Sequence, residues 1–167
     1  LFHIVLYQPE IPPNTGNIGR SCVAAGAKLW MIEPLGFQLE EKQLRRAGLD
    51  YWQYLNWQTV PSWHDLLQQP ELSSAVRDKR FWFLTKKGKH PHSSPQFQAG
   101  DVFVFGSESS GLPAEILAAH SDRTLRIPMR PEVRSLNLSA AAGIVLYEGV
   151  RQIEQQGSNH PTLSQLE

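Results

Sequence analysis

Short runs of consecutive apolar residues recur along the chain and are separated by polar or amphipathic segments. Four of them, at 2–7, 29–32, 81–84 and 102–105, are four to six residues long and nearly free of polar side chains. Runs of this kind are typical of strands that are covered on both faces of a sheet. A further strand is predicted at 124–127, where Pro128 ends it because proline cannot donate to a sheet ladder.

Helices are predicted between these runs. Ser62 is placed to cap a helix at 63–69, and Pro113 suits the first turn of a helix at 113–120. Residues 14–20, Asn-Thr-Gly-Asn-Ile-Gly-Arg, are interpreted as a loop leading into a helix that ends near Ala25. A short charged helix is predicted at 42–47, whereas the aromatic segment 50–57 is ambiguous. Strands that alternate with helices indicate an α/β fold with a mostly parallel sheet flanked by helices.

The last helix is expected to be the most deeply buried element. Small and apolar residues fill positions 138–146, and charge returns only at Glu148. Either Ser135 or Asn137 supplies the side-chain oxygen that caps this helix. A helix that is apolar nearly all round is a buried one, and the small residues at 140–143 are expected to let another backbone come close. Residues 1–155 are predicted to form a single domain, and 156–167 a loose tail.

Polar segments follow three of the predicted strands. They occupy 85–89, 106–113 and 129–139. In parallel sheets ligands bind outside the carboxyl ends of the strands, so these segments are predicted to form one pocket. The glycines at 106 and 111 match neither a Walker loop, because no Lys-Ser/Thr pair follows them, nor a Gly-x-Gly-x-x-Gly dinucleotide turn.

Composition narrows the class of protein. The 167 residues are 41% hydrophobic and contain one cysteine, Cys22, which excludes an internal disulfide and suits a reducing cytosol. Cys22 is interpreted as a small buried filler. The start of the sequence lacks the basic flank of a signal peptide, and no apolar run reaches the length of a membrane span. A soluble, cytoplasmic protein is therefore expected.

Two classes of chemistry find little support. His90 and His92 share a short segment, but no cluster of cysteine or acidic residues completes a ligand set, so no metal site is predicted. The absence of a Gly-x-Ser-x-Gly elbow argues against an α/β-hydrolase.

The formal net charge is zero, but basic residues are clustered. Six of them lie between Arg77 and Lys89 against a single acid, Asp78. The other clusters are Lys42, Arg45 and Arg46, and Arg123, Arg126, Arg130 and Arg134. Two interpretations remain open: ordinary solvated surface, or a phosphate-binding surface that a symmetric dimer would double.

Three segments, taken together, resemble the motifs of the SPOUT RNA methyltransferases, and they occur in the same order. They are Asn14-Thr15-Gly16-Asn17-Ile18-Gly19-Arg20, Phe105-Gly106-Ser107-Glu108-Ser109-Ser110-Gly111-Leu112-Pro113, and Ile127-Pro128-Met129 with Ser135-Leu136-Asn137-Leu138-Ser139. The segments Ile4-Val5-Leu6-Tyr7, Pro9-Glu10-Ile11-Pro12, Ile32-Glu33-Pro34-Leu35-Gly36-Phe37 and Leu44-Arg45-Arg46-Ala47-Gly48-Leu49-Asp50-Tyr51 look like the bacterial tRNA (cytidine/uridine-34)-2′-O-methyltransferases, the TrmL or YibK type. The resemblance covers about residues 2–153.

This resemblance implies a C-terminal deep trefoil knot, which general topology rules make rare. It also implies a homodimer that binds S-adenosyl-L-methionine within the knot and acts on the anticodon region of tRNA. The implied cofactor-binding residues are Leu84, Thr85, Gly106, Glu108, Gly111, Ile127, Met129, Ser135, Leu136 and Asn137.

The activity that the resemblance implies is 2′-O-methylation of the wobble nucleotide 34 of tRNA, a cytidine or a modified uridine. Arg20 matches the catalytic arginine of the family, and Asn14, Glu108 and Asn137 complete the implied catalytic set; loop capping is an equally open role for the two asparagines. RNA contacts are assigned to Arg20, Lys42, Arg45, Arg46, Lys86, Lys87, Arg134 and Tyr147. Tyr51, Trp52 and Trp57 either stack an anticodon base or pack in the core.

Three departures from the family pattern stand in the motifs. Ser107 replaces a proline, Ser110 an arginine and Ala140 an asparagine. Because the glycine and glutamate of the second motif persist, cofactor binding is expected to survive. The alternatives are the same chemistry on another RNA such as ribosomal RNA, or a knotted RNA- or cofactor-binding module without catalysis.

Overall fold

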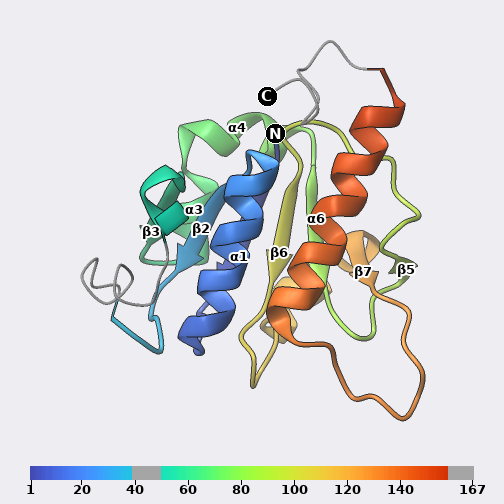
Figure 1. Cartoon of the computed structure of the whole chain (residues 1–167). Coiled ribbons are helices and arrows are strands. Elements are labelled where there is room, and N and C mark those ends of the chain that lie inside the picture. The colour runs from blue at the N-terminus through green and yellow to red at the C-terminus, as the bar shows by residue number, and fades with distance from the viewer. Residues whose placement is uncertain (39–49, 158–167) are drawn as a thin grey trace.

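Parallel strands form one seven-stranded sheet in the computed structural model, whose described residues are 1–38 and 50–157 (Figure 1). The strands are β1 (His3–Tyr7), β2 (Lys28–Ile32), β3 (Trp57–Val60), β4 (Phe81–Leu84), β5 (His90–Pro91), β6 (Val102–Phe105) and β7 (Thr124–Arg126). Their order across the sheet is β3-β2-β1-β6-β4-β7-β5, and every pair is parallel. The predicted α/β class with a mostly parallel sheet is confirmed.

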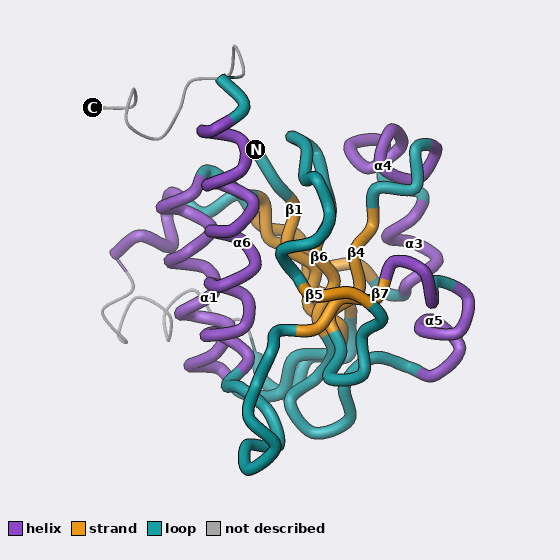
Figure 2. The backbone as a smooth tube through the Cα atoms, turned by 90° about the vertical axis from the view of Figure 1, so that its right-hand side faces the viewer, coloured by secondary structure: helices purple, strands orange, loops and turns teal. Residues whose placement is uncertain are grey.

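Helices cover both faces of the sheet (Figure 2). They are α1 (Pro12–Ala25), α3 (Trp63–Leu67), α4 (Ser73–Arg77), α5 (Ala114–Ala119) and α6 (Leu138–Gln155), with 3₁₀ turns at Asp50–Tyr54, Pro70–Leu72 and Ser121–Arg123. The long helices α1 and α6 lie side by side on one face, and the short α3, α4 and α5 cover the other. Side chains alternate between the faces along each strand, so Ile4 and Leu6 enter one core and Val5 the other.

The central strands are those whose apolar runs are unbroken. All residues of β2 and β6 are buried, as the predictions at 29–32 and 102–105 require. The edge strands β3 and β5 are half-exposed and short, and no apolar run indicated them. The ambiguous segment 50–57 divides into a 3₁₀ turn and the start of β3. The helix predicted at 42–47 lies outside the described residues.

The loop predicted at 14–20 is wrong, because α1 already begins at Pro12. Pro12 and Pro13 occupy its first turn, where a missing N–H costs nothing and the fixed φ favours a helix. The helix ends at Gly26, whose φ of 63° is left-handed. Residues 14–20 therefore form about two turns of regular helix and not a loop.

Helix α6 is buried on one side only, which corrects the expectation of burial all round. Ile144 and Tyr147 are 40% and 45% exposed. At Gly149 a Cβ would lie 2.8 Å from Cζ of the Phe2 side chain, whereas one on Gly143 would meet nothing within 4 Å. Among the described residues no helix is long and apolar enough to cross a bilayer.

The segment between β5 and β6 is fastened at two places. Gln152 of α6 accepts from the Phe97 amide at 2.8 Å and donates to the Pro95 carbonyl at 3.1 Å. The carboxylate of Asp101, which is 1% exposed, receives both Nε and Nη2 of Arg80 at 2.7 Å and the Trp82 indole N–H at 2.9 Å. This segment thus holds the C-terminal half of α6 against the sheet.

Replacing Asp101 with alanine should lower the free energy of unfolding by about 3 kcal/mol, because it leaves the largely buried Arg80 guanidinium without its counter-ion. Urea denaturation measures the change. Asp122→Ala is the control: its pair with Lys89 is exposed, and such pairs contribute little. Equal losses in the two variants would contradict a special role for Asp101.

Candidate functional site

A cleft of about 560 Å³ opens at the carboxyl ends of β4, β6 and β7. Its walls come from four parts of the chain: the start of α1, the loop after β4, the loop after β6 together with Leu117 of the helix α5 that follows it, and the segment from β7 to the first turn of α6. The three polar segments predicted to converge therefore do so, at the edge of the sheet where parallel α/β folds bind ligands.

The loop after β6 folds back on itself tightly. A Cβ on Gly106 would lie 2.0 Å from the carbonyl carbon of Gly111, so only glycine permits this approach. Gly111 has a φ of 68°, and its amide donates to the Ser107 carbonyl at 3.0 Å. The Ser107 hydroxyl accepts from the Ser110 amide at 3.3 Å. The hydroxyl thus provides a local restraint on the turn.

Glu108 ties this loop to the beginning of α1. Its carboxylate accepts from the backbone amide of Glu10 at 2.8 Å, the amide of Ile11 at 3.1 Å and the side-chain amide of Asn14 at 3.2 Å. Ile11, the N-cap residue of α1, makes no capping hydrogen bond of its own. A carboxylate at a helix N-terminus is favoured by the helix dipole, so Glu108 satisfies donors that this helix start leaves open. Ser109 adds a 2.6 Å hydrogen bond to Glu10.

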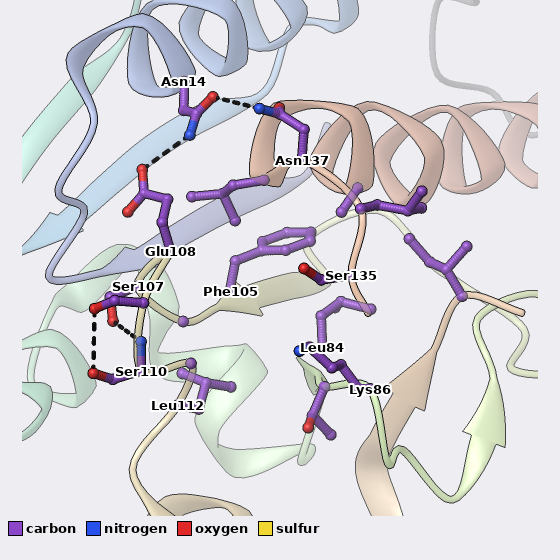
Figure 3. A pocket seen from close by; sticks show the side chains of 18 of the residues that line it. Asn14, Leu84, Lys86, Phe105, Ser107, Glu108, Ser110, Leu112, Ser135 and Asn137 are labelled. Atoms are coloured by element: carbon purple, nitrogen blue, oxygen red, sulfur yellow. Dashed lines mark hydrogen bonds between the residues drawn. The ribbon is translucent and has the colours of Figure 1, made fainter. Parts of the chain in front are cut away.

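Asn14 is also hydrogen-bonded to Asn137 at the start of the last helix, α6 (Figure 3). Its Oδ1 accepts from Nδ2 of Asn137 at 2.9 Å. Oδ1 of Asn137 caps α6 by accepting from the Ser139 and Ala140 amides at 2.9 and 3.4 Å, so Asn137 and not Ser135 is the cap. One hydrogen-bonded chain, Glu108–Asn14–Asn137, therefore joins all three sequence motifs.

Some of the basic residues near the cleft are paired with carboxylates and others are not. Three of the six basic residues between 77 and 89 pair with carboxylates: Arg77 with Asp78, Arg80 with Asp101 and Lys89 with Asp122. Lys86 and Lys87 line the cleft and have no carboxylate partner in the described part of the chain, and Figure 3 shows Lys86 reaching into it. Because Glu108 is engaged by three donors, the unpaired charge at this site is positive.

All ten residues predicted to bind the cofactor line the cleft: Leu84, Thr85, Gly106, Glu108, Gly111, Ile127, Met129, Ser135, Leu136 and Asn137. Several apolar lining residues were not among those predicted to bind the cofactor: Ile11, Phe105, Leu112, Leu125, Leu138 and Ala141. Phe105 and Leu125 are strand residues next to the polar segments, so their position was a usable signal. Ile11 lies in the segment 9–12 that carries part of the resemblance, three residues before Asn14.

Arg20 does not line the cleft of its own chain. It lies six residues beyond Asn14, about 9 Å along the axis of α1, and its side chain is exposed. The guanidinium carbon is 4.9 Å from the centre of the Tyr51 ring. Partial burial raises the pKa of Tyr51 above its usual value, and the positive charge of Arg20 opposes that rise. Within one chain, therefore, the fold does not bring Arg20 to the cleft.

The remaining residues that the sequence analysis considered lie outside the cleft or outside the described residues. Arg134 and Tyr147 are exposed and outside the cleft, while Lys42, Arg45 and Arg46 lie outside the described residues. Trp52 is 5% exposed and belongs to the core. Cys22 is buried, which raises the pKa of its thiol to about 12. In the described ranges, no three His, Cys, Asp or Glu side chains gather to hold a metal ion.

Known proteins are similar to this chain in sequence and in fold. A tRNA (cytidine(34)-2′-O)-methyltransferase of Methylovorus glucosotrophus (strain SIP3-4) is 50% identical over 159 residues, 95% of this chain and 99% of the relative. A solved structure that gives structural insights into the 2-OH methylation of C/U34 on tRNA superposes with a TM-score of 0.82 at 42% identity, covering 92% of this chain and 97% of the other.

A more distant solved structure carries the cofactor. The SpoU methyltransferase AviRb from Streptomyces viridochromogenes, in complex with AdoMet, has a TM-score of 0.75 at 26% identity and covers 92% of this chain and 60% of that one. The fold is thus the α/β knot fold of the SpoU and SPOUT methyltransferases. Residues 1–147 match the SpoU rRNA Methylase family, and the chain belongs to that family.

Proposed function

We propose that this protein transfers a methyl group from S-adenosyl-L-methionine to the 2′-oxygen of nucleotide 34 of tRNA, a cytidine or a modified uridine. The observation that carries the proposal is the convergence of the three motifs on one cleft, joined by Glu108, Asn14 and Asn137. The near-complete coverage of a tRNA (cytidine(34)-2′-O)-methyltransferase at 50% identity supports the choice of substrate.

The cleft is suited to such a cofactor. Its volume falls within the range of roughly 300–1,000 Å³ that is usual for small-molecule sites. Apolar side chains such as Leu84, Leu112 and Ile127 can enclose an adenine ring, and Gly106 and Gly111 line the cleft with backbone that no side chain covers. Lys86 offers a positive charge to a carboxylate or a phosphate group.

The proposed chemistry is in-line displacement. When bound, S-adenosyl-L-methionine supplies an activated sulfonium methyl group that an oxygen nucleophile can take. The residues of the chain must align the ribose hydroxyl and assist the loss of its proton. Arg20 stays protonated and is a poor base. Its proposed role is to hold an RNA phosphate and to stabilise negative charge that develops on the attacking oxygen, while that phosphate or a neighbouring group accepts the proton.

We infer a homodimer that completes the site. The exposed face of α6 carries Ala140, Ile144 and Tyr147 at spacings of four and three residues, which places them on one stripe. Arg20 lies on the exposed side of the adjacent helix α1. Pairing two copies through this face would bring Arg20 of one copy toward the cleft of the other. The arrangement accounts for an arginine that lies outside its own cleft.

Incubation with labelled S-adenosyl-L-methionine and total tRNA, followed by mapping of the modified nucleoside, tests the proposed function directly. Label in a 2′-O-methylnucleotide at position 34 is the expected result. Label in ribosomal RNA instead would favour that substrate, and cofactor binding without transfer to any RNA would favour a non-catalytic module.

Arg20→Ala should reduce methyl transfer roughly 10²–10³-fold, the usual effect of removing a group that stabilises charge in the transition state. Because Arg20 lies outside the cleft, the Kd for the cofactor should stay near the wild-type value; calorimetry measures it. Arg77→Ala, which changes an exposed arginine paired only with its neighbour Asp78, is the control. Full turnover of the Arg20 variant would refute its catalytic role.

Glu108→Gln should raise the Kd for S-adenosyl-L-methionine about tenfold. The change removes the negative charge and one acceptor from a group with three donors, and hydrogen bonds to charged groups are the stronger ones. Glu115→Gln, on the exposed surface of α5, serves as the matched control. An unchanged Kd in the Glu108 variant would show that the loop keeps its shape without this carboxylate.

Ile144→Asp should dissociate the dimer at low micromolar concentration, because it places a charge in an apolar contact. Light scattering gives the mass, and the monomer should bind the cofactor yet lose methyl transfer. Val76→Asp on α4 changes a residue that is 39% exposed on the opposite face of the sheet and should leave the mass unaltered. A fully active monomer would contradict the proposal that two copies complete the site.

A further inference from the structure

Arg20 is held by an aromatic residue from a different part of the chain. Its guanidinium carbon lies 4.9 Å from the centre of the Tyr51 ring, a distance at which a cation is attracted to the face of an aromatic ring. The Tyr51 hydroxyl donates to the carbonyl of Gly16 at 2.6 Å. Gly16 is four residues before Arg20, so the two positions share one face of α1. Tyr51 therefore contacts both the side chain of Arg20 and the helix turn that carries it.

The 3₁₀ turn that bears Tyr51 is itself fixed against α1. A Cβ on Gly19 would lie 2.8 Å from Cζ3 of Trp52 and 3.0 Å from Cδ2 of Leu55. The absence of a side chain at Gly19 thus lets the turn pack directly on the helix. Trp52 and Leu55 are 5% and 7% exposed and belong to the core. The position of the Tyr51 ring is consequently set by the core packing of the residues that follow it, Trp52 and Leu55.

Arg20 needs such a partner. Within residues 1–38 and 50–157 it forms no ion pair, and its side chain is exposed. An unrestrained arginine side chain populates many rotamers. A group that acts in a transition state is most effective when its orientation is set beforehand.

We propose that Tyr51 is a positioning residue for Arg20: it orients the guanidinium on the exposed face of α1 through its ring and anchors the helix turn through its hydroxyl. The inference rests on the proposed function, in which Arg20 stabilises the reacting oxygen. The ring and the hydroxyl of Tyr51 both interact with Arg20, so the test removes them separately.

The test compares Tyr51→Leu, which removes the ring, with Tyr51→Phe, which keeps it. The Nε–Hε resonance of Arg20, assigned by its loss in Arg20→Ala, reports the ring contact independently of activity. We expect Tyr51→Leu to move this resonance toward that of a solvent-exposed arginine and to lower turnover about fivefold. The cofactor Kd should not change. Tyr51→Phe should keep the resonance and most of the turnover.

Controls separate positioning from general stability. Tyr54→Leu removes a tyrosine from the same turn that is 73% exposed and should affect neither readout. Tyr51→Met supplies a flexible apolar side chain and stands in if the leucine variant fails to fold. An unmoved Arg20 resonance, or turnover equal to that of Tyr54→Leu, would overturn the inference. Full activity of Arg20→Ala would instead refute the catalytic role of Arg20, whatever the resonance shows.

Discussion

The carboxylate of Glu108 is the contact on which the site depends. It brings the loop after β6 to the start of α1, where Pro12 and Pro13 have no N–H and the N-cap residue Ile11 makes no capping hydrogen bond. Asn14 extends the contact to Asn137, and Asn137 begins α6. Hydrogen bonds to a charged group are stronger than those between neutral groups. A cleft assembled from four separate parts of the chain can therefore keep one shape.

Close backbone contacts complete this arrangement. A Cβ on Gly88 would lie 2.2 Å from the carbonyl carbon of Leu125, and one on Gly106 would lie 2.0 Å from that of Gly111. Arg126 fastens the first of these crossings by donating to the Gly88 and Lys89 carbonyls at 2.8 Å. Glycine at these two positions lets the backbone come this close without displacing its neighbour.

The sequence predicted elements where one physical signal dominated. Apolar runs identified the strands β1, β2, β4 and β6, and the polar segments after the strands located the cleft. Edge strand β3, with its mixed exposure, and the two-residue β5 have no comparable signal. The glycines and asparagines at 14–20 suggested a loop, but Pro12 and Pro13 in the preceding turn decided the outcome. That one side of α6 faces outward, with Ile144 and Tyr147 exposed, depends on what packs against it and cannot be read from composition.

The hydrogen-bonded chain from Glu108 to α6 also has a direction. An ionised carboxylate only accepts, so Asn14 must turn its NH₂ group toward Glu108 and its oxygen toward Asn137. Asn137 must then donate its own NH₂ group, which leaves its oxygen free for the α6 amides. One acidic residue thus determines the orientation of two amides in turn. Evolutionary change at these positions is expected to be concerted, since reversing donor and acceptor at one of them would oppose two like groups at the next.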